Sequence, residues 1–497
     1  MISYEINRLL KFALDHELIS QRDKIYCANL LLDVLQLSQY EEEEVSEVLN
    51  RADDILDAML DYAITNKLIE DTITQRDLFD TRIMNCIMPR PSVISDKFWD
   101  YYKISPQKAT DYYYNLSIAS NYIRKSRVEK DMKWVAMSKY GELEISINLS
   151  KPEKDPKEIA KAKLVKATTY PKCAICKENE GFAGNLKLAA RESHRLIPLQ
   201  LSKEDWYLQY SPYVYYNEHC IILNSEHKDM IIDRKGFANL LEFLDYFPHY
   251  FIGSNADLPI VGGSILTHDH YQGGCYTMPI MKAKVVKRYE LNKYPDVEIE
   301  HIYWPLTTLR ITAKNKDTLI DCSDHILNKW RNYSDESLQI YATSSGERHN
   351  TITPIARKKD DLYELNLVLR NNKTSVDYPL GIFHPHQEVH HIKKENIGVI
   401  EVAGLAILPA RLKDELQIIR KELNGDTFSK EEGLLIDKHK DWIKELKEKR
   451  SKDMSTDLMD FLKAEIAIRF QKVLEDCGVF KFNEEGVLGL ERFIEIL

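Results

Sequence analysis

The stretch from Ile260 to Pro279, IVGGSILTHDHYQGGCYTMP, decides how the rest of this 497-residue chain is interpreted. An apolar run from Ile260 to Leu266 leads into the pattern H-x-H-x-Q at His268, His270 and Gln272, and a glycine pair follows. Residues i, i+2 and i+4 of a strand share one face. The sequence therefore predicts a strand here, with two imidazoles and an amide that point to one spot.

Two imidazoles and an amide between glycine pairs favour phosphate chemistry. Glycines let backbone N–H groups approach an anion closely, and a neutral imidazole is a good nitrogen nucleophile near pH 7. The competing interpretation is a structural or metal-ligand pair, because an H-x-H on a strand more often has that role. The rest of the chain has to decide between them.

The composition is that of a globular protein, 44% hydrophobic and 29% charged, long enough for about two to four domains. A net charge of −10 argues against a nucleic-acid partner, which needs a basic surface. The eight cysteines are mostly scattered and predict no disulfide framework. No apolar window reaches the roughly 18 residues of a membrane span, and the charged N-terminal stretch does not read as a signal peptide. We expect no membrane association and a cytoplasmic location.

Apolar residues recur three and four positions apart in the first part of the chain, which predicts a helical domain over residues 1–165. A charged, proline-containing stretch at 151–163 is expected to be its exposed linker. Strands and helices then alternate in a half that carries the candidate chemistry, 166–335, and in a second half, 336–410. Residues 411–497 are again predicted to be helical. The fold class expected from this pattern is α+β.

Four elements inside these halves are predicted from their patterns. Strands are expected at 207–216 and 220–223, because the first is aromatic and alternating and the second is apolar. The stretch 234–247 has the spacing of an amphipathic helix. Two β-rich runs that meet at 358–361 predict a hairpin.

Cys173 and Cys176 form a C-x-x-C motif followed by a glycine, a geometry in which two thiolates can hold one zinc ion. This is half of a metal site, so a free buried pair or a redox pair are alternatives. His227, in a polar turn after the strand predicted at 220–223, is a candidate for the missing half or a surface histidine. Asn255 is either a turn former or a contact to a ribose or phosphate.

A second group of histidines follows the predicted hairpin in GIFHPHQEVHHIKKENIGVIEVAGLAILP. This run repeats the theme of a strand with H-x-H at its edge, and it suggests two similar halves, the second degenerate. The group is expected either to bind a metal or to be polar packing; its members are His384, His386, His390, His391 and Glu401.

The order of these motifs resembles that in the galactose-1-phosphate uridylyltransferases of the histidine-triad superfamily. The shared order is C-x-x-C, then S-x-x-H after a buried strand, then H-x-H-x-Q at the end of a glycine-containing strand. The long helical N-terminal segment and the runs QYSPYVYYNEHCIILNSEH and SNADLPIVGGSILTHDHYQGG resemble the second family of these enzymes, typical of Gram-positive bacteria. The resemblance covers essentially the whole chain. It implies a histidine-triad-like core of two related halves with a mainly antiparallel sheet, flanked by helical segments.

The resemblance also implies an activity, the transfer of a uridylyl group from UDP-glucose to galactose-1-phosphate in galactose metabolism. His270 would be the nucleophile of a double displacement, and Gln272 would hydrogen-bond a non-bridging phosphoryl oxygen. A structural zinc would be bound by Cys173, Cys176, His227 and His268. The substrate would be contacted by Asn255, Gly262, Gly263 and Ser264. No organic cofactor is implied.

Other features of the resemblance are less direct. His384 and His386 are similar to the H-x-H of a second metal site in the first family, and that family's dimeric site implies a homodimer here. Asp269 and Tyr271 depart from the first family, which has proline and glycine at these two places. This departure leaves the proposed nucleophile His270 intact.

Two rival functions fit the same motifs. A nucleotidyl hydrolase or phosphorylase would use the same nucleophile but would resolve the intermediate with water or phosphate. A zinc-stabilised, non-catalytic binding protein would use the cysteines and histidines for structure only. The role of His270 distinguishes an enzyme from the binding protein, because only an enzyme needs a free ring nitrogen on His270 as nucleophile.

Overall fold

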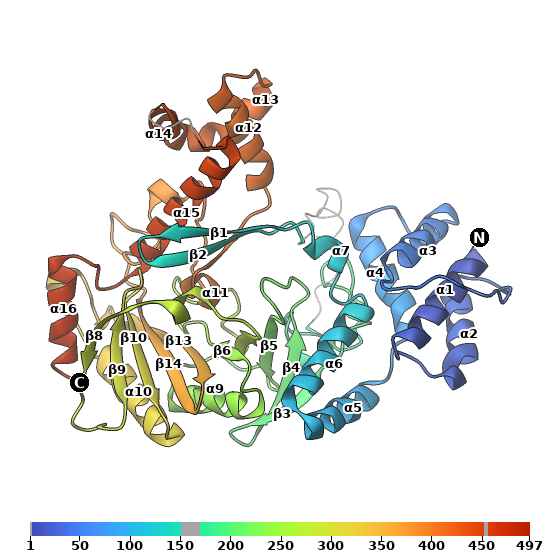
Figure 1. Cartoon of the computed structure of the whole chain (residues 1–497), viewed down its shortest axis with the longest axis horizontal. Helices are drawn as coiled ribbons and strands as arrows, with labels where there is room; N and C mark the ends of the chain where they lie inside the picture. The colour runs from blue at the N-terminus through green and yellow to red at the C-terminus, as the bar shows by residue number, and fades with distance from the viewer. Residues whose placement is uncertain (1, 151–168, 452–455) are drawn as a thin grey trace. The chain divides into compact units, whose positions relative to one another are not determined.

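The computed structural model describes residues 2–150, 169–451 and 456–497, which form two compact units of helices and strands (Figure 1). The first unit consists of Met1–Lys130, Ser150–Asp229 and Thr267–Gly274, and the second of Asp131–Leu149, Met230–Leu266 and Cys275–Leu497. The linker predicted at 151–163 lies outside the described residues. The four-part domain division predicted from the sequence stays a prediction.

Helices make up the N-terminal part of the first unit, as predicted. In the first of them the apolar residues three and four apart, such as Ile6, Leu9 and Leu10, are all fully buried. Serine and threonine side chains cap two of the others, at Thr72 and Ser105. The helices are α1 (Ile2–Asp15), α2 (Lys24–Val34), α3 (Asp53–Thr65), α4 (Ile73–Asn85), α5 (Pro91–Ile104), α6 (Pro106–Ala119) and α7 (Lys125–Val128), with 3₁₀ turns η1 (Gln21–Asp23) and η2 (Lys177–Asn179).

Four antiparallel strands of the first unit lie in the order β3, β4, β5, β7. Their bounds are β3 (Ile197–Leu201), β4 (Glu204–Tyr210), β5 (Cys220–Asn224) and β7 (His270–Gly274). Tyr113 of α6 fixes that helix to the strands, because its buried hydroxyl donates to the carbonyl oxygen of Arg195 at 2.5 Å. The same hydroxyl lies 3.3 Å from the carbonyl oxygen of Leu208 in β4, so α6 is held against the strand that pairs with β5, the neighbour of β7.

Two predicted strands differ from the observed ones. The strand at 207–216 ends at Tyr210, because Pro212 follows and cannot donate to a ladder. The strand expected over Ile260–Leu266 is wrong: Ile260 has a φ of +74°, and the backbone only becomes a regular strand at His270. His268 consequently lies before the strand rather than on it.

The second unit has a larger antiparallel sheet in the order β6, β13, β14, β10, β9, β8. Its strands are β6 (Phe251–Gly253), β8 (Val285–Tyr289), β9 (Glu298–Ile302), β10 (Thr308–Ala313), β13 (Asn350–Lys359) and β14 (Leu362–Asn371). The predicted hairpin is confirmed, since β13 and β14 turn at Asp360 and Asp361.

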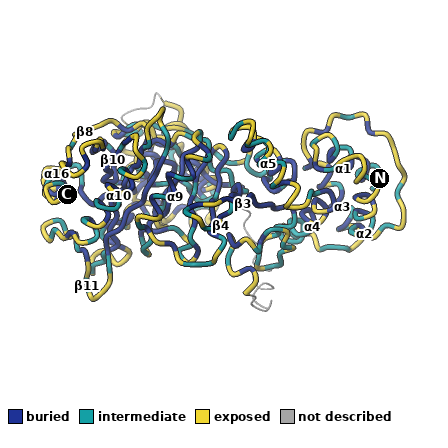
Figure 2. Tube along the Cα trace, turned by 90° about the horizontal axis from the view of Figure 1, so that it is seen from below, coloured by how far each residue is buried: buried dark blue, intermediate teal, exposed yellow. Residues whose placement is uncertain are grey.

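Helices α9 (Arg234–Tyr246) and α10 (Lys316–Arg331) pack on this sheet, and the trace around β10, α9 and α10 is mostly buried (Figure 2). The predicted helix at 234–247 is thus confirmed. The buried indole N–H of Trp330 donates to the carbonyl oxygens of Thr351 and Arg370, which ties α10 to both strands of the hairpin.

A second, smaller sheet pairs β1 (Met132–Ser138) antiparallel to β2 (Gly141–Ile147) and β2 parallel to β15 (Leu405–Leu408). The prediction of helix throughout 1–165 is wrong for these two N-terminal strands. Their sequences alternate along the strand, and Gly141 at φ +117° closes a two-residue turn between them.

The remainder of the second unit is mostly helical, as predicted beyond residue 410. Its helices are α11 (Val399–Val402), α12 (Leu412–Asn424), α13 (Lys430–Ile436), α14 (Lys440–Arg450), α15 (Leu458–Cys477) and α16 (Glu484–Ile494), with short turns η3 (Pro279–Lys282), η4 (Glu336–Leu338), η5 (Gln387–Val389) and η6 (Asp437–His439) and the small hairpin β11 (Thr343–Ser344) and β12 (Glu347–Arg348). The expected α+β class with mainly antiparallel sheet is confirmed. The second H-x-H motif lies in turns before η5, not at a strand edge as expected.

Candidate active site and metal centre

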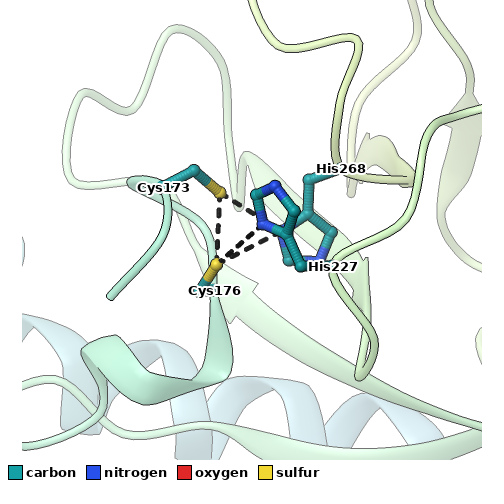
Figure 3. A group of neighbouring side chains, drawn as sticks. All are labelled: Cys173, Cys176, His227 and His268. Atoms are coloured by element: carbon teal, nitrogen blue, oxygen red, sulfur yellow. Dashed lines mark hydrogen bonds between the residues drawn. The ribbon is translucent and has the colours of Figure 1, made fainter. Parts of the chain in front are cut away.

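Two cysteines and two histidines from separate loops of the first unit converge on one point (Figure 3). Cys173 and Cys176 lie in the turn that leads into η2. His227 follows β5, and His268 precedes β7. Because β5 and β7 are hydrogen-bonded neighbours, the loops at their ends bring the two histidines to the same edge of the sheet.

The distances within this cluster, which we call the Cys₂His₂ cluster, suit a shared metal ion. The sulfur of Cys173 lies 3.2 Å from Nδ1 of His268, and the sulfur of Cys176 lies 3.1 Å from Nδ1 of His227. The two sulfurs are 3.4 Å apart, and all four ligand atoms lie within 4.8 Å of one another. Two thiols and two imidazoles are a donor set typical of structural zinc, which is tetrahedral.

Neighbouring groups orient the ligands of the cluster. His268 donates its Nε2–H to the carbonyl oxygen of Asn224 at 2.8 Å, which leaves the lone pair on Nδ1 pointing at the sulfurs. The amide of Asn179 donates to the carbonyl oxygens of Cys173 and Cys176 and so holds the C-x-x-C turn. Such hydrogen bonds fix ring tautomer and ligand direction, so the residues fit a bound zinc ion.

Burial has opposite effects on the two kinds of ligand. It raises the pKa of the Cys173 thiol to about 12 and lowers the pKa of His268 below its ordinary value. The imidazole is therefore ready to bind as a neutral ligand. A cation at the centre would be needed to keep the thiol as a thiolate.

His270, two residues after His268, is buried at the start of β7. Its Nδ1–H donates to the carbonyl oxygen of His268 at 2.8 Å, so the lone pair is on Nε2. Burial lowers the pKa of His270, more than the hydrogen bond to His268 raises it. The ring is thus a neutral imidazole in one tautomer, which is the state that a nitrogen nucleophile requires.

Gln272 shares a strand face with His270, because side chains alternate along β7. Its Oε1 lies 3.1 Å from Nε2 of the buried His219. The sequence prediction that His268 shares this spot is wrong, since His268 lies before the strand and its ring meets the cysteines. The sequence pattern also missed His219, whose only signal is its place directly before an apolar strand.

The two departures from the resembling family have physical roles here. The backbone N–H of Asp269 donates to the carbonyl oxygen of Lys228 at 2.7 Å, a bond that proline cannot make. Tyr271 points to the other face of β7 and stacks on Trp206, with ring centroids 4.9 Å apart. Both residues therefore support the backbone that carries His270.

The glycine-rich loop before β7 belongs to the second unit from Met230 to Leu266. Gly263 packs against Asn255 so closely that an added Cβ would lie 2.4 Å from the Asn255 amide nitrogen. A Cβ added at Gly262 would lie 2.5 Å from the carbonyl oxygen of Ala256 and 2.6 Å from that of Leu258. Ser264 is exposed. The loop is thus compact around Asn255.

Hydrogen bonds fix this loop to the second unit. Oδ1 of Asn255 accepts from the backbone N–H of Val399 at 2.8 Å. The carboxylate of Asp257, which the sequence did not single out, accepts from Arg348, the hydroxyl of Thr351 and the backbone of Ile232. Both ends of the turn that precedes the glycines are therefore fixed by hydrogen bonds, with Gly262 buried and Gly263 partly exposed.

The second histidine group does not converge. His384 contacts Asn396 and the Pro385 carbonyl oxygen, and His390 donates to that same carbonyl. His391 contacts His439 at 2.8 Å, and Glu401 pairs with Lys393. These partners are those of polar packing.

His386 alone of that group lies where a metal could be held. It forms a group of possible ligands with Glu388 and Asp476. Lys472 pairs with both of these carboxylates, and Nδ1 of His386 lies 3.5 Å from Asp476. The ammonium group of Lys472 is thus an ion-pair partner already present in this set, whereas the Cys₂His₂ cluster consists of two thiols and two imidazoles.

Comparison with known proteins identifies a single family over most of the chain. Residues 17–229 match the family model of the galactose-1-phosphate uridyl transferase N-terminal domain, and residues 242–444 match that of the C-terminal domain. The first match contains the Cys₂His₂ cluster up to His227, and the second contains His268, His270 and Gln272.

Curated relatives match over all or nearly all of their length. The chain is 55% identical to the galactose-1-phosphate uridylyltransferase of Clostridium acetobutylicum, over 100% of both chains. It is 50% identical to that of Clostridium perfringens, over 99% of this chain and 98% of the relative. That of Bacillus subtilis is 46% identical over 99% of this chain and 97% of the relative. Among the described residues, no helix is both long and apolar enough to cross a membrane.

Proposed function

Because the chain belongs to the galactose-1-phosphate uridylyltransferase family, we propose that it transfers the uridylyl group of UDP-glucose to galactose-1-phosphate through a uridylyl-His270 intermediate. The products of the full cycle are glucose-1-phosphate and UDP-galactose. Zinc at the Cys₂His₂ cluster, a homodimer and a cytoplasmic location are part of the same proposal.

One observation carries the choice of nucleophile, the hydrogen bond from Nδ1 of His270 to the carbonyl oxygen of His268. A carbonyl oxygen accepts only, so Nδ1 carries the proton and Nε2 keeps its lone pair. A nucleophile in this state needs no separate base. The lowered pKa of His270 keeps that lone pair available at neutral pH.

The reaction consists of two in-line displacements at the α-phosphorus. Nε2 of His270 attacks UDP-glucose, the bond from the α-phosphorus to the bridging oxygen breaks, and glucose-1-phosphate leaves with the electron pair. A phosphate oxygen of galactose-1-phosphate then attacks the same phosphorus, and the Nε2–P bond breaks. His270 returns to its neutral tautomer, so no net proton change is required.

Charge that develops on the equatorial phosphoryl oxygens needs hydrogen-bond donors that are already in place. The side-chain amide of Gln272, on the same strand face as His270, is proposed as one such donor. Backbone N–H groups of Gly262, Gly263 and Ser264 are proposed as others, with Asn255 as a further substrate contact. Removal of one such donor typically costs about 2.7–4 kcal/mol of transition-state stabilisation.

The zinc ion is proposed as a structural ligand of Cys173, Cys176, His227 and His268. With four protein ligands it would have no open position, and it would supply a cross-link between loops rather than a Lewis acid. His268 then has two roles, since its ring is a ligand and its backbone oxygen sets the tautomer of His270. The cluster therefore supports the nucleophile through the backbone of His268, two residues before His270.

The proposal is tested by incubation of the enzyme with radiolabelled UDP-glucose alone. We expect release of one equivalent of glucose-1-phosphate and an acid-labile uridylyl adduct on His270, discharged as UDP-galactose when galactose-1-phosphate is added. Steady release of UMP without a sugar phosphate would instead identify a hydrolase. A folded, zinc-containing protein that forms no adduct at all would identify the non-catalytic alternative.

A further inference from the structure

His219 is a buried histidine next to the proposed site that none of the motifs includes. It lies directly before β5, is 3% exposed, and its Nε2 is 3.1 Å from Oε1 of Gln272. We propose that His219 is the positioning residue that fixes the side-chain amide of Gln272 for phosphoryl transfer. This inference rests on the proposed function, because it concerns the group that contacts the phosphoryl oxygen.

The direction of this hydrogen bond decides what Gln272 can offer. Oε1 of an amide accepts only, so Nε2–H of His219 donates to it. The amide oxygen is thereby engaged, and the NH₂ group is the end of Gln272 that is left to a ligand. If the Gln272 amide were turned by 180°, it would present Oε1 to the substrate instead of its NH₂ group. The lone pairs of Oε1 and of a phosphoryl oxygen would then repel each other.

The imidazole of His219 is itself held in place. It stacks on Tyr215 with ring centroids 5.3 Å apart and packs on Tyr216 at 4.6 Å. The hydroxyl of Tyr216 donates to the carbonyl oxygen of Gly273, the residue after Gln272. The segment before β5 is therefore bound to β7 at the side chain of Gln272 and at the backbone of the next residue, Gly273.

Strand pairing keeps these groups in register. Ile221 of β5 is the partner of Gln272, and Leu223 is the partner of His270. His219 thus stands at the end of the strand whose backbone also aligns the nucleophile. A group at this place can orient the amide without any contact to the substrate, which is the role of a positioning residue.

The test compares two replacements of His219 in the full-length enzyme. In His219→Phe the ring that packs on Tyr215 and Tyr216 is kept and the donor is lost, whereas His219→Gln keeps an N–H donor. We expect His219→Phe to lower the rate of uridylyl-enzyme formation about tenfold, with the KM for UDP-glucose unchanged. This loss is smaller than the one expected when the Gln272 amide itself is removed. His219→Gln is expected to restore most of that rate. The half-exposed His249→Phe serves as the matched control and should leave the rate unchanged.

A double-mutant cycle with Gln272→Ala separates a role in positioning from a general loss of structure. If His219 acts only through the amide, His219→Phe has no further effect on the rate in the Gln272→Ala enzyme. A tenfold loss that persists in that background would overturn the inference, as would a His219→Phe enzyme with the wild-type rate. If Gln272→Ala itself keeps the wild-type rate, the proposed role of Gln272 fails instead. Thermal unfolding and zinc content, measured in parallel, show which variants are folded.

Discussion

The chain contains two H-x-H motifs, and the structure uses them differently. At the first, the ring of His268 meets two cysteine sulfurs, and the ring of His270 donates to a backbone carbonyl. At the second, His384 contacts an asparagine, and His386 lies beside the Asp476 carboxylate. The same spacing thus serves a metal-type cluster in one place and polar packing in the other.

The difference lies in partners that are distant in the sequence. The first motif is joined by Cys173 and Cys176, whose thiols contact each other and the imidazoles of His227 and His268. Burial raises the pKa of the Cys173 thiol to about 12, so a cation is needed to ionise it. The second is joined by two carboxylates, Glu388 and Asp476, that both pair with Lys472. An H-x-H motif is therefore informative only together with the charge of the groups that surround it.

Loss of the metal is expected to have the largest effect, and it tests the contrast between the two H-x-H motifs. Chelation, or the Cys176→Ser variant, should lower the zinc content from about one atom per chain to near none. It should destabilise the first unit by several kcal/mol, because metal binding is coupled to folding. Elemental analysis and thermal unfolding measure the two quantities. Asp476→Asn is the control, and a loss of zinc in that variant would show that the second motif holds the metal.

Replacement of the nucleophile is expected to be the next largest effect. His270→Asn should lower turnover at least about 10³-fold, because a reaction through a covalent intermediate has no substitute for its nucleophile. Zinc content and unfolding temperature should stay close to wild type, since His270 is not a ligand. The matched variant at the other motif, His384→Asn, should still form the uridylyl adduct. An active His270→Asn enzyme would remove the basis of the proposed mechanism.

A moderate effect is expected at the second motif. Asp476→Asn removes a buried carboxylate that accepts from the backbone N–H of His386 and pairs with Lys472. The free energy of unfolding should fall by about 1–3 kcal/mol, the usual cost of leaving a buried polar group without its partner. Chemical denaturation measures this value. Unchanged stability would mean that the motif contributes nothing to packing.

Much of the fold follows from local patterns in the sequence. Periodicity correctly predicted the N-terminal helices, the helix at 234–247 and the hairpin at 358–361, because their side-chain spacing agrees with their burial. It failed at Ile260–Leu266, where an apolar, β-rich run forms an irregular loop. The reversal at Ile260, with φ +74°, depends on contacts with the rest of that loop and not on residue type.

The candidate site likewise contains residues that the sequence predicted and residues that it did not. The four members of the Cys₂His₂ cluster were inferred as a ligand set from the resemblance, and the structure brings them together. The groups that orient them, such as Asn179 and the Asn224 carbonyl, were not inferred. Nor was His219, since nothing in its own sequence surroundings marks a residue that acts through a partner 53 positions away.

The smallest expected effect concerns the continuation of the second motif, His391. Its Nδ1 lies 2.8 Å from Nδ1 of His439, and Nε2 of His439 donates to the Glu415 carboxylate. Burial, with nearby positive charges, lowers the pKa of His391 to about 3. Below its ordinary pKa of 6.5 the unfolded chain binds a proton that the folded chain does not. Stability should therefore decrease as the pH falls from 6.5 towards 3, by at most about 1.4 kcal/mol per pH unit.

The His391→Phe variant isolates this contribution, since phenylalanine keeps the ring against Trp442 and cannot titrate. The loss of unfolding free energy between pH 7 and pH 5 should be smaller in the variant than in the wild type. His249→Phe, which removes a histidine outside this chain of hydrogen bonds, should keep the wild-type pH dependence. Equal slopes for wild type and His391→Phe would show that the folded protein accepts this proton. The pKa of His391 would then be the same in the folded and the unfolded chain. The contrast between the second histidine group and the neutral rings of the first motif would be lost.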